Sequence, residues 1–179
     1  FTKNVIMRPL MRYFTLLVVC FVFYAFPAHV ETISRGAIPL IERLNPNILA
    51  GVFQAATRVE ALEDGGPVAV AAYNNDQLIG YVFSTLDVVR APGYSSIPFD
   101  VVGGVTLDGR ITGAAVLFHR EPHLTDEPDR EAKLVQFLGN MKGMEARMGA
   151  LHDGYQPSFV AGATISARAM RNAILESSQ

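Results

Sequence analysis

The chain has 179 residues, half of them hydrophobic, and a formal net charge of -2, which is typical of one folded domain with a hydrophobic extension. Its 15 basic and 17 acidic residues form no lysine- or arginine-rich run, so the sequence lacks the basic surface that nucleic-acid binding requires. The single cysteine, Cys20, excludes an intrachain disulfide and a cysteine-based metal cluster.

The first 30 residues predict an export segment. Basic residues precede an unbroken apolar run over about 13–28, which is the order of a secretory signal. At roughly 15 residues the run is shorter than the ~20 that span a bilayer comfortably. Bulky Phe26 stands where signal cleavage prefers a small residue, so an uncleaved anchor is the alternative. We therefore expect residues 1–30 to be a signal peptide or membrane anchor and residues 31–179 to form one domain.

Two short helices are expected directly after this segment. Apolar residues over 38–62 recur at helical spacing on both sides of Asn45-Pro46, which breaks a helix. The break predicts two short amphipathic helices rather than one long helix.

Two β-hairpins follow in the chain. Residues 67–89 carry two β-type runs around Asn74-Asn75-Asp76, which tolerate turn conformations. Residues 97–121 repeat the pattern around Asp108-Gly109, the strongest short hairpin signal in the chain. The hairpins predict a twisted antiparallel sheet of about four strands, in which Gly103-Gly104 indicates a bulge rather than a phosphate loop.

The segments outside the hairpins predict loops and helices. Residues 90–99, rich in Pro, Gly and Ser, are expected to form a loop across an edge of the sheet. Two helices are predicted near the end of the chain, separated by turn-rich residues 151–160, and their inner faces consist of Leu134, Phe137, Leu138 and Met141 in the first and Ala167, Met170, Ala173 and Ile174 in the second. Strands in one block with helices on either side in sequence make the fold class α+β.

The sequence offers little support for metal or hydrolase chemistry. His119 and His123 are four apart, but Pro122 breaks the helical turn that a zinc motif of this spacing needs. A polar loop after the last strand is the simpler interpretation, and such a loop can line a ligand pocket. The chain has no Gly-x-Ser-x-Gly, Walker or Gly-x-Gly-x-x-Gly motif, so hydrolase and nucleotide-triphosphate chemistry have no support.

The triplet Gly162-Ala163-Thr164 precedes the last predicted helix. Gly162 permits a tight turn, Ala163 adds little bulk, and the Thr164 hydroxyl is placed to cap the helix. A helix start also presents free N–H groups and the positive end of the helix dipole, which attract phosphate. These residues leave two interpretations open, a plain N-cap and an anion site with a hydroxyl beside the anion.

From about Leu44 to Ile174 the sequence resembles the FMN-binding domain family of exported bacterial respiratory flavoproteins. The segments that carry the resemblance are Gly162-Ala163-Thr164, LIGYVFSTLDVV and GYSSIPFDVVGGVTLDGRITGAAVLFHREP. The last two are similar to the NosR-type branch, which is linked to nitrous oxide reductase. In this family a Ser/Thr-Gly-Ala-Thr motif carries FMN through a phosphodiester on its final Thr.

The resemblance implies a set of cofactor-binding residues and no metal ligand. Thr164 would be the covalent acceptor, with Ser166 a poorer candidate, and the two loops before the motif would approach the isoalloxazine ring. The full set is Gly93, Tyr94, Glu121, Pro122, Ala161, Gly162, Ala163, Thr164, Ile165 and Ser166. Two positions depart from the family motif, because Ala161 replaces Ser or Thr and Ser158 replaces Asp.

The function that the resemblance implies is electron transfer by an exported FMN-carrying domain that supports nitrous oxide reductase in denitrification, rather than turnover of a soluble substrate. Its partners would be respiratory redox proteins at the membrane, nitrous oxide reductase or its maturation system, and a flavin-attaching enzyme. It would lie in the periplasm or on the outer face of the cytoplasmic membrane of a bacterium. The departures at Ser158 and Ala161 favour the alternative, an exported binding, sensing or structural module of a respiratory complex without covalent flavin.

Overall fold

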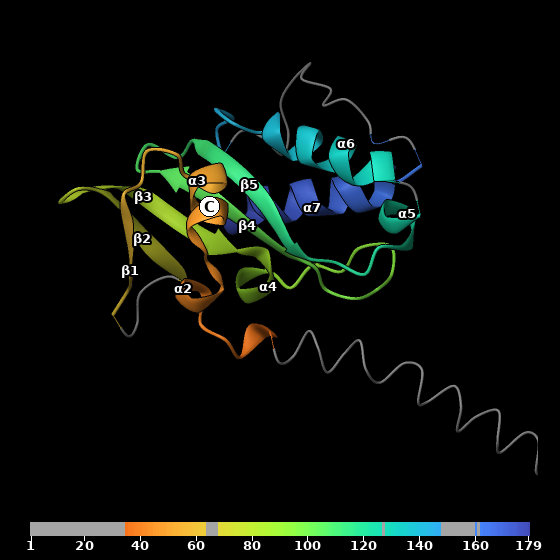
Figure 1. The fold of residues 1–179 in the computed structure, drawn as a ribbon, viewed down its shortest axis with the longest axis horizontal. Coiled ribbons are helices and arrows are strands. Elements are labelled where there is room, and N and C mark those ends of the chain that lie inside the picture. Colours follow the sequence, from red (N-terminus) through yellow and green to blue (C-terminus); the bar gives the residue numbers. More distant parts are fainter. Residues whose placement is uncertain (1–34, 64–67, 127, 148–159, 161) are drawn as a thin grey trace, which may run out of the picture.

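A five-stranded antiparallel sheet forms the centre of the domain, and helices pack on both of its faces (Figure 1). The strand order β1-β2-β3-β4-β5 follows the chain, and the predicted α+β class is confirmed. The strands are β1 (Arg58–Ala61), β2 (Ala69–Asn74), β3 (Gln77–Ser84), β4 (Asp100–Thr106) and β5 (Ile111–Phe118). The helices are α2 (Leu40–Arg43), α3 (Pro46–Val52), α4 (Thr85–Val88), α5 (Pro122–Thr125), α6 (Pro128–Gly139) and α7 (Thr164–Ser177).

The computed structural model describes residues 35–63, 68–126, 128–147, 160 and 162–179. The predicted export segment and nearly all of the turn-rich segment before the Gly-Ala-Thr triplet lie outside these residues. In the part of the chain that is described, no helix has the length and apolar character of a membrane span.

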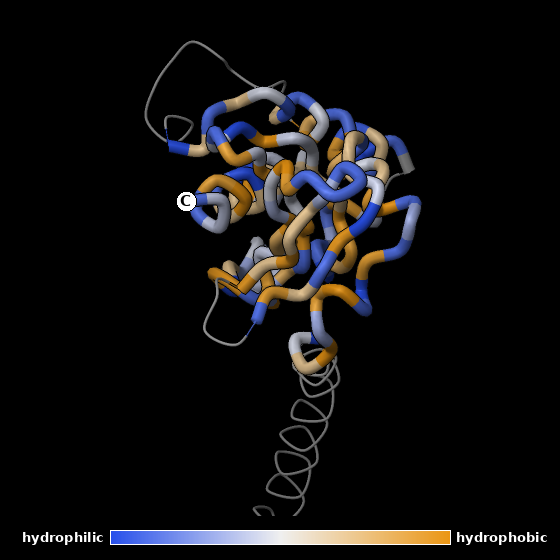
Figure 2. Tube along the Cα trace, turned by 90° about the vertical axis from the view of Figure 1, so that its left-hand side faces the viewer, coloured by the Kyte–Doolittle hydropathy of each residue, from blue (hydrophilic) through white to orange (hydrophobic). Residues whose placement is uncertain are grey.

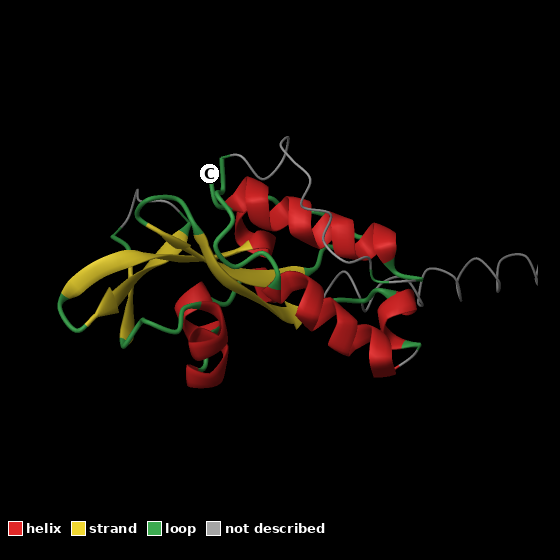
Figure 3. Cartoon of the chain, turned by 90° about the horizontal axis from the view of Figure 1, so that it is seen from above, coloured by secondary structure: helices red, strands yellow, loops and turns green. Residues whose placement is uncertain are grey.

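Side chains alternate between the two faces of the sheet and build a hydrophobic core on each. On β3, Val82 packs with α2 and α3, while the next residue, Phe83, packs with α6 and α7. Figure 3 shows α6 and α7 at one end of the molecule, with the sheet extending beyond them. In Figure 2 hydrophobic segments run through the middle of the domain. Both predicted inner faces are confirmed, because every predicted residue is buried: Leu134, Phe137, Leu138, Met141, Ala167, Met170, Ala173 and Ile174.

The two predicted short helices are present, but the second ends earlier than expected. Asn45 caps α3 by accepting a hydrogen bond from the N–H of Ile48 (2.9 Å between Oδ1 and N), and Pro46 is the first helical residue. Residues 58–61, which the helical pattern included, instead form the edge strand β1. A four-residue strand without a fully buried face gives no clear alternation, so the sequence prediction missed the fifth strand.

Both predicted hairpins are confirmed. The β2–β3 turn contains Asn75 with a φ of 54°, and the β4–β5 turn contains Gly109 with a φ of 80°. The register between β4 and β5 shifts after Gly104, as the predicted bulge requires. The first hairpin is shorter than predicted, because residues 85–88 form the helical turn α4, which the hydroxyl of Ser84 caps.

A buried ion network fixes α2 to the sheet. The guanidinium of Arg43 donates to Asp100 on β4 (2.6 Å between Nη1 and Oδ2) and to Asp87 on α4. The hydroxyl of Ser84 donates to the other oxygen of Asp100 (2.6 Å). Burial raises the pKa of Asp87, and Arg43 offsets only part of this effect. The network depends on its single arginine, because a buried carboxylate without a partner is strongly destabilising.

We expect Arg43→Met to lower the free energy of unfolding by about 3–5 kcal/mol, because it leaves Asp87 and Asp100 buried without this cation. Denaturant unfolding followed by circular dichroism measures the loss. The control is Arg58→Met, which removes a solvent-exposed ion pair with Glu60 and should cost about 1 kcal/mol or less. Equal losses in the two variants would contradict the role assigned to Arg43.

Candidate functional site

The Gly-Ala-Thr triplet forms the turn into α7. Gly162 has a φ of 82°, in the left-handed region that favours glycine, and Ala163 is the N-cap of the helix. The prediction that Thr164 caps the helix is wrong. Thr164 is the first helical residue, and its hydroxyl donates to the carbonyl of Val160 (3.2 Å). The cap position lies one residue earlier, because capping side chains project from the residue that precedes the first helical one.

The start of α7 has no side-chain cap. Ala163 has no hydrogen-bonding side chain, and α7 has no side-chain cap hydrogen bond among the described residues. A helix of 14 residues directs its first-turn N–H groups and the positive end of its dipole out of this terminus. The half-buried Thr164 lies at the same point. This end of the helix suits an anion.

Arg130, in the first turn of α6, lies against the turn before α7. A Cβ atom at Gly162 would be 2.9 Å from Nη2 of Arg130 and 3.0 Å from its Cζ, so a larger residue would collide with the guanidinium. Nη1 of Arg130 donates to the carbonyl of His123 on α5 (3.1 Å). Figure 1 shows the starts of α6 and α7 at the same end of the molecule as α5. A cation therefore lies against Gly162, the residue two positions before Thr164.

The carboxylate of Glu121 joins the segments assigned to the cofactor. Glu121 is fully buried. It accepts hydrogen bonds from the N–H of Tyr94 (2.9 Å), from the N–H and hydroxyl of Ser95 (3.2 and 2.7 Å) and from the hydroxyl of Ser166. Gly93 is so close that a Cβ atom there would be 2.2 Å from Oε1 of Glu121. The loop after α4, the segment after β5 and the first turn of α7 therefore meet at one carboxylate.

These hydrogen bonds hold Glu121 in its ionised form. Burial by itself raises the pKa of Glu121, but the hydrogen bonds from Ser166, Ser95 and the N–H of Tyr94 outweigh that effect and lower the pKa below its usual value. A buried charge is tolerated where several donors satisfy its oxygens. The carboxylate thus fixes the surrounding backbone because each donor loses its acceptor if Glu121 moves.

The rings of Tyr94 and His123 pack together beside this carboxylate. Their centroids are 5.0 Å apart and their planes are tilted by 54°, and Tyr94 is 55% exposed. The pair therefore presents an open aromatic surface. His119 differs, because its Nδ1 accepts from the N–H of Glu121 (3.2 Å) and burial lowers its pKa. Within the described residues, no group of three or more His, Cys, Asp or Glu side chains could hold a metal ion.

The remaining predicted site residues divide between surface and interior. Ile165 is large and apolar but 64% exposed, and Pro122 is the exposed first residue of α5. Ser166 is buried and donates to Glu121, whereas Thr164 is half-buried. Ala161 lies outside the described residues.

Three residues of this site were not predicted as cofactor-binding residues: Ser95, His123 and Arg130. Only Arg130 carries a signal that the sequence could have given. It lies in the first turn of a helix, where the dipole favours acids such as its neighbours Asp129 and Glu131. Ser95 and His123 join the site through contacts with segments distant in sequence, which no local pattern records.

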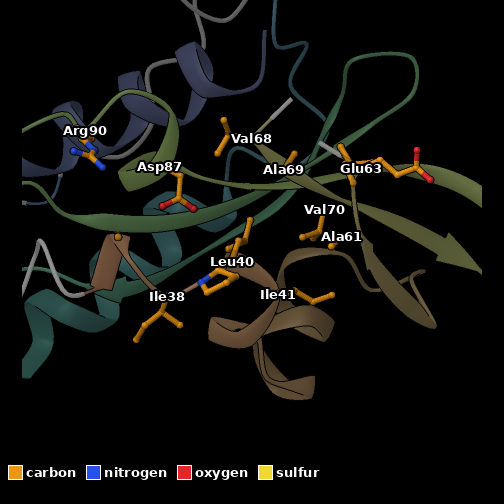
Figure 4. Close-up of a pocket in the computed structure, with 13 residues that line it drawn as sticks. Ile38, Leu40, Ile41, Ala61, Glu63, Val68, Ala69, Val70, Asp87 and Arg90 are labelled. Carbon is orange, nitrogen blue, oxygen red and sulfur yellow. The ribbon is translucent and has the colours of Figure 1, made fainter. Parts of the chain in front are cut away.

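Two cavities lie elsewhere on the domain. One, of about 440 Å³, is lined by α2, by residues around β1 and β2, and by Asp87 and Arg90 (Figure 4). The other, of about 450 Å³, includes Phe53, Ile111 and Lys142 in its lining. Neither contains a residue of the predicted site. Cavities are the usual first candidates for ligand sites, but here the donors that suit an anion lie at the start of α7.

The fold and the site together define an α+β domain in which one carboxylate joins the uncapped start of α7 to the loop that carries the exposed Tyr94. Residues 93–178 match the FMN-binding domain family. FMN is the cofactor that this match supports. The match begins at Gly93, the residue that packs against Glu121.

The similarity to one known protein covers more of the chain than residues 93–178. Protein NirI of Paracoccus denitrificans (strain Pd 1222) is 29% identical to this chain over 103 residues, which make up 58% of this chain and 15% of NirI. The chain therefore spans only a small part of the length of that relative.

We expect Gly93→Ala to lower the free energy of unfolding by about 1–3 kcal/mol, because the new Cβ atom must displace the carboxylate of Glu121. Thermal or denaturant unfolding measures this loss. Gly51→Ala is the matched control, since Gly51 lies in α3 with nothing within 4 Å of an added Cβ, and it should be neutral or stabilise by up to about 1 kcal/mol. A Gly93 variant as stable as the wild type would show that the carboxylate is not fixed at this position.

The ionised Glu121 also makes stability depend on pH. Its folded pKa is lower than the ordinary value of 4.5, so its stabilisation is complete above that pH and is lost as the pH falls through the folded pKa. We expect Glu121→Gln to lower the free energy of unfolding by about 2–4 kcal/mol at neutral pH, and the difference from the wild type to shrink in acid.

The control for this series is Glu176→Gln, an exposed residue near the end of α7, which should change stability by about 0.5 kcal/mol or less. Denaturant unfolding at a series of pH values measures all three proteins. A difference between Glu121→Gln and the wild type that stays constant into acid would contradict an ionised Glu121.

Proposed function

We propose that this chain is an exported electron-transfer domain that carries FMN, with the flavin phosphate at the start of α7. The observation that supports the proposal most is the uncapped start of a 14-residue helix with the Thr164 hydroxyl beside it. The first-turn N–H groups of an uncapped helix fit a phosphate, and the Thr164 oxygen lies beside them. The family match supports FMN as the source of that phosphate.

The described side chains take separate roles in this proposal. The first-turn N–H groups of α7 bind the phosphate, and the exposed rings of Tyr94 and His123 contact the isoalloxazine ring, with Ile165 as further apolar surface. Glu121 is buried, so it acts by holding the Tyr94 loop against the helix that carries Thr164. FMN supplies one- and two-electron redox chemistry when bound.

We further propose that FMN is linked to Thr164 through a phosphodiester. The Thr164 oxygen forms a bond to the flavin phosphorus as the bond from phosphorus to the activating group breaks. The hydroxyl proton of Thr164 leaves with the displaced activating group. The product therefore has the mass of the chain plus FMN minus one water. A flavin-attaching enzyme would supply the activated flavin phosphate. Ser166 is the poorer acceptor, because the Ser166 hydroxyl is buried and donates to Glu121.

The proposed setting is the periplasm or the outer face of the cytoplasmic membrane of a bacterium. The basic flank and apolar run within residues 1–30 support export. Respiratory redox proteins are the proposed partners, and support of nitrous oxide reductase in denitrification is the proposed process. The similarity of the hairpin segments to NosR-type proteins supports this assignment.

The alternative function is an exported binding, sensing or structural module of a respiratory complex that keeps the fold without covalent flavin. Ser158 and Ala161 favour it, because they depart from the residues that the family motif has before Gly-Ala-Thr. Both lie outside the described residues, so the alternative is decided by experiment.

The test is the intact mass and visible absorption of the full chain, made with a flavin-attaching enzyme in a host that exports it. We expect a yellow protein whose colour survives denaturation and whose mass rises by that of FMN minus water. Thr164→Ala should abolish this gain, and Thr164→Ser should retain part of it because the hydroxyl remains. Thr125→Ala is the matched control, since its hydroxyl also donates to a nearby carbonyl, that of Pro122 (3.0 Å), and it should keep full loading.

The possible outcomes separate the two parts of the proposal. Colour that is lost on denaturation keeps FMN binding and contradicts the covalent link. A colourless protein of unmodified mass contradicts both and favours the alternative module.

A further inference from the structure

A guanidinium stands at the junction of two helix starts. Arg130 belongs to the first turn of α6 and lies against Gly162, just before α7. The positive end of each helix dipole lies at the first turn, so both helices contribute positive potential at this junction. Asp129 and Glu131, in the same turn of α6, offset the positive end of the helix dipole. The cation of Arg130 instead adds to that positive potential. Arg130 thus places a cation beside the start of α7, next to the uncapped N–H groups.

The surrounding backbone fixes where this cation lies. The missing side chain at Gly162 leaves room for Nε, Cζ and Nη2 of Arg130, which would all lie within 3.2 Å of a Cβ atom there. The carbonyl of His123 holds Nη1 from the other side (3.1 Å). The planar guanidinium has a rigid fork of donors whose geometry matches phosphate oxygens. Gly162 therefore provides both the turn into α7 and the space for the guanidinium of Arg130.

We propose that Arg130 binds the phosphate of FMN at the start of α7 and thereby distinguishes FMN from flavins without phosphate. This inference rests on the proposed function, which places the flavin phosphate at this helix start. The contact also orients the phosphate beside Thr164, because Arg130 is held against the residue two positions before it. Arg130 acts on the phosphate end of the cofactor, and the Tyr94–His123 pair lies on the ring side.

The position of Arg130 predicts a difference between two ligands. FMN and riboflavin share the isoalloxazine ring, but only FMN has the phosphate. Loss of Arg130 should therefore weaken the binding of FMN and leave the binding of riboflavin unchanged. A purely structural role would weaken both ligands together, because a displaced α6 would disturb the site as a whole.

The experiment is titration of the full chain, made in a host without the flavin-attaching enzyme, with FMN and with riboflavin, followed by flavin fluorescence. We expect Arg130→Gln to raise the Kd for FMN at least tenfold, which is about 1.4 kcal/mol, and to change the Kd for riboflavin less than about twofold. Arg130→Lys keeps the charge but not the fork, and should fall between Arg130→Gln and the wild type. Arg58→Gln, at the exposed edge strand β1, is the charge-matched control and should bind both ligands as the wild type does.

Melting temperatures of all variants accompany the titrations, and Arg130→Lys provides the comparison if Arg130→Gln does not fold. Equal weakening of FMN and riboflavin, or no weakening of FMN, would overturn the inference while leaving FMN binding intact. A wild-type chain that binds neither flavin would contradict the proposed function itself, which is a distinguishable result.

Discussion

The candidate site depends on one buried carboxylate. Glu121 accepts hydrogen bonds from the loop after α4 and from the first turn of α7, and no part of this contact is local in sequence. Because the carboxylate is ionised and fully buried, it tolerates little displacement before its desolvation goes uncompensated. The exposed Tyr94 ring and the start of α7 are therefore held in a fixed relation. The buried charge of Glu121 thus fixes the geometry of a site whose aromatic ring, Tyr94, is exposed.

The rest of the fold supports this arrangement from two sides. The core residues of α6 and α7 pack against the face of the sheet that carries Phe83, and this packing places the start of α7 beside α5. On the opposite face, Arg43 fixes α2 to Asp87 and Asp100. At the site, neutral N–H and hydroxyl donors satisfy the carboxylate of Glu121. Away from the site, the cation of Arg43 pairs with two carboxylates.

Periodicity predicted most of the fold, since the hairpins, the bulge and the inner faces of α6 and α7 follow from patterns along the chain. Periodicity failed at Arg58–Ala61, where a four-residue edge strand carries no alternation. Residue type failed at Thr164, because the backbone places the cap at Ala163. Motif resemblance identified Glu121 and Tyr94 as site residues, but not that a buried carboxylate joins them. That contact spans 27 residues of sequence, and burial at such separation is a property of the packed fold.

The start of α7 also explains why an alanine suits the N-cap. Ser, Thr, Asp or Asn at Ala163 would stabilise the free helix by about 1 kcal/mol, but their side chains would occupy the N–H groups that a phosphate needs. An alanine leaves those groups available, and in the proposed complex the phosphate would serve as the cap. Any ligand that binds only the folded state stabilises it by mass action. On this proposal the missing cap makes the free domain less stable and its complex with the ligand correspondingly more stable, while Glu121 would keep the helix start in place in both.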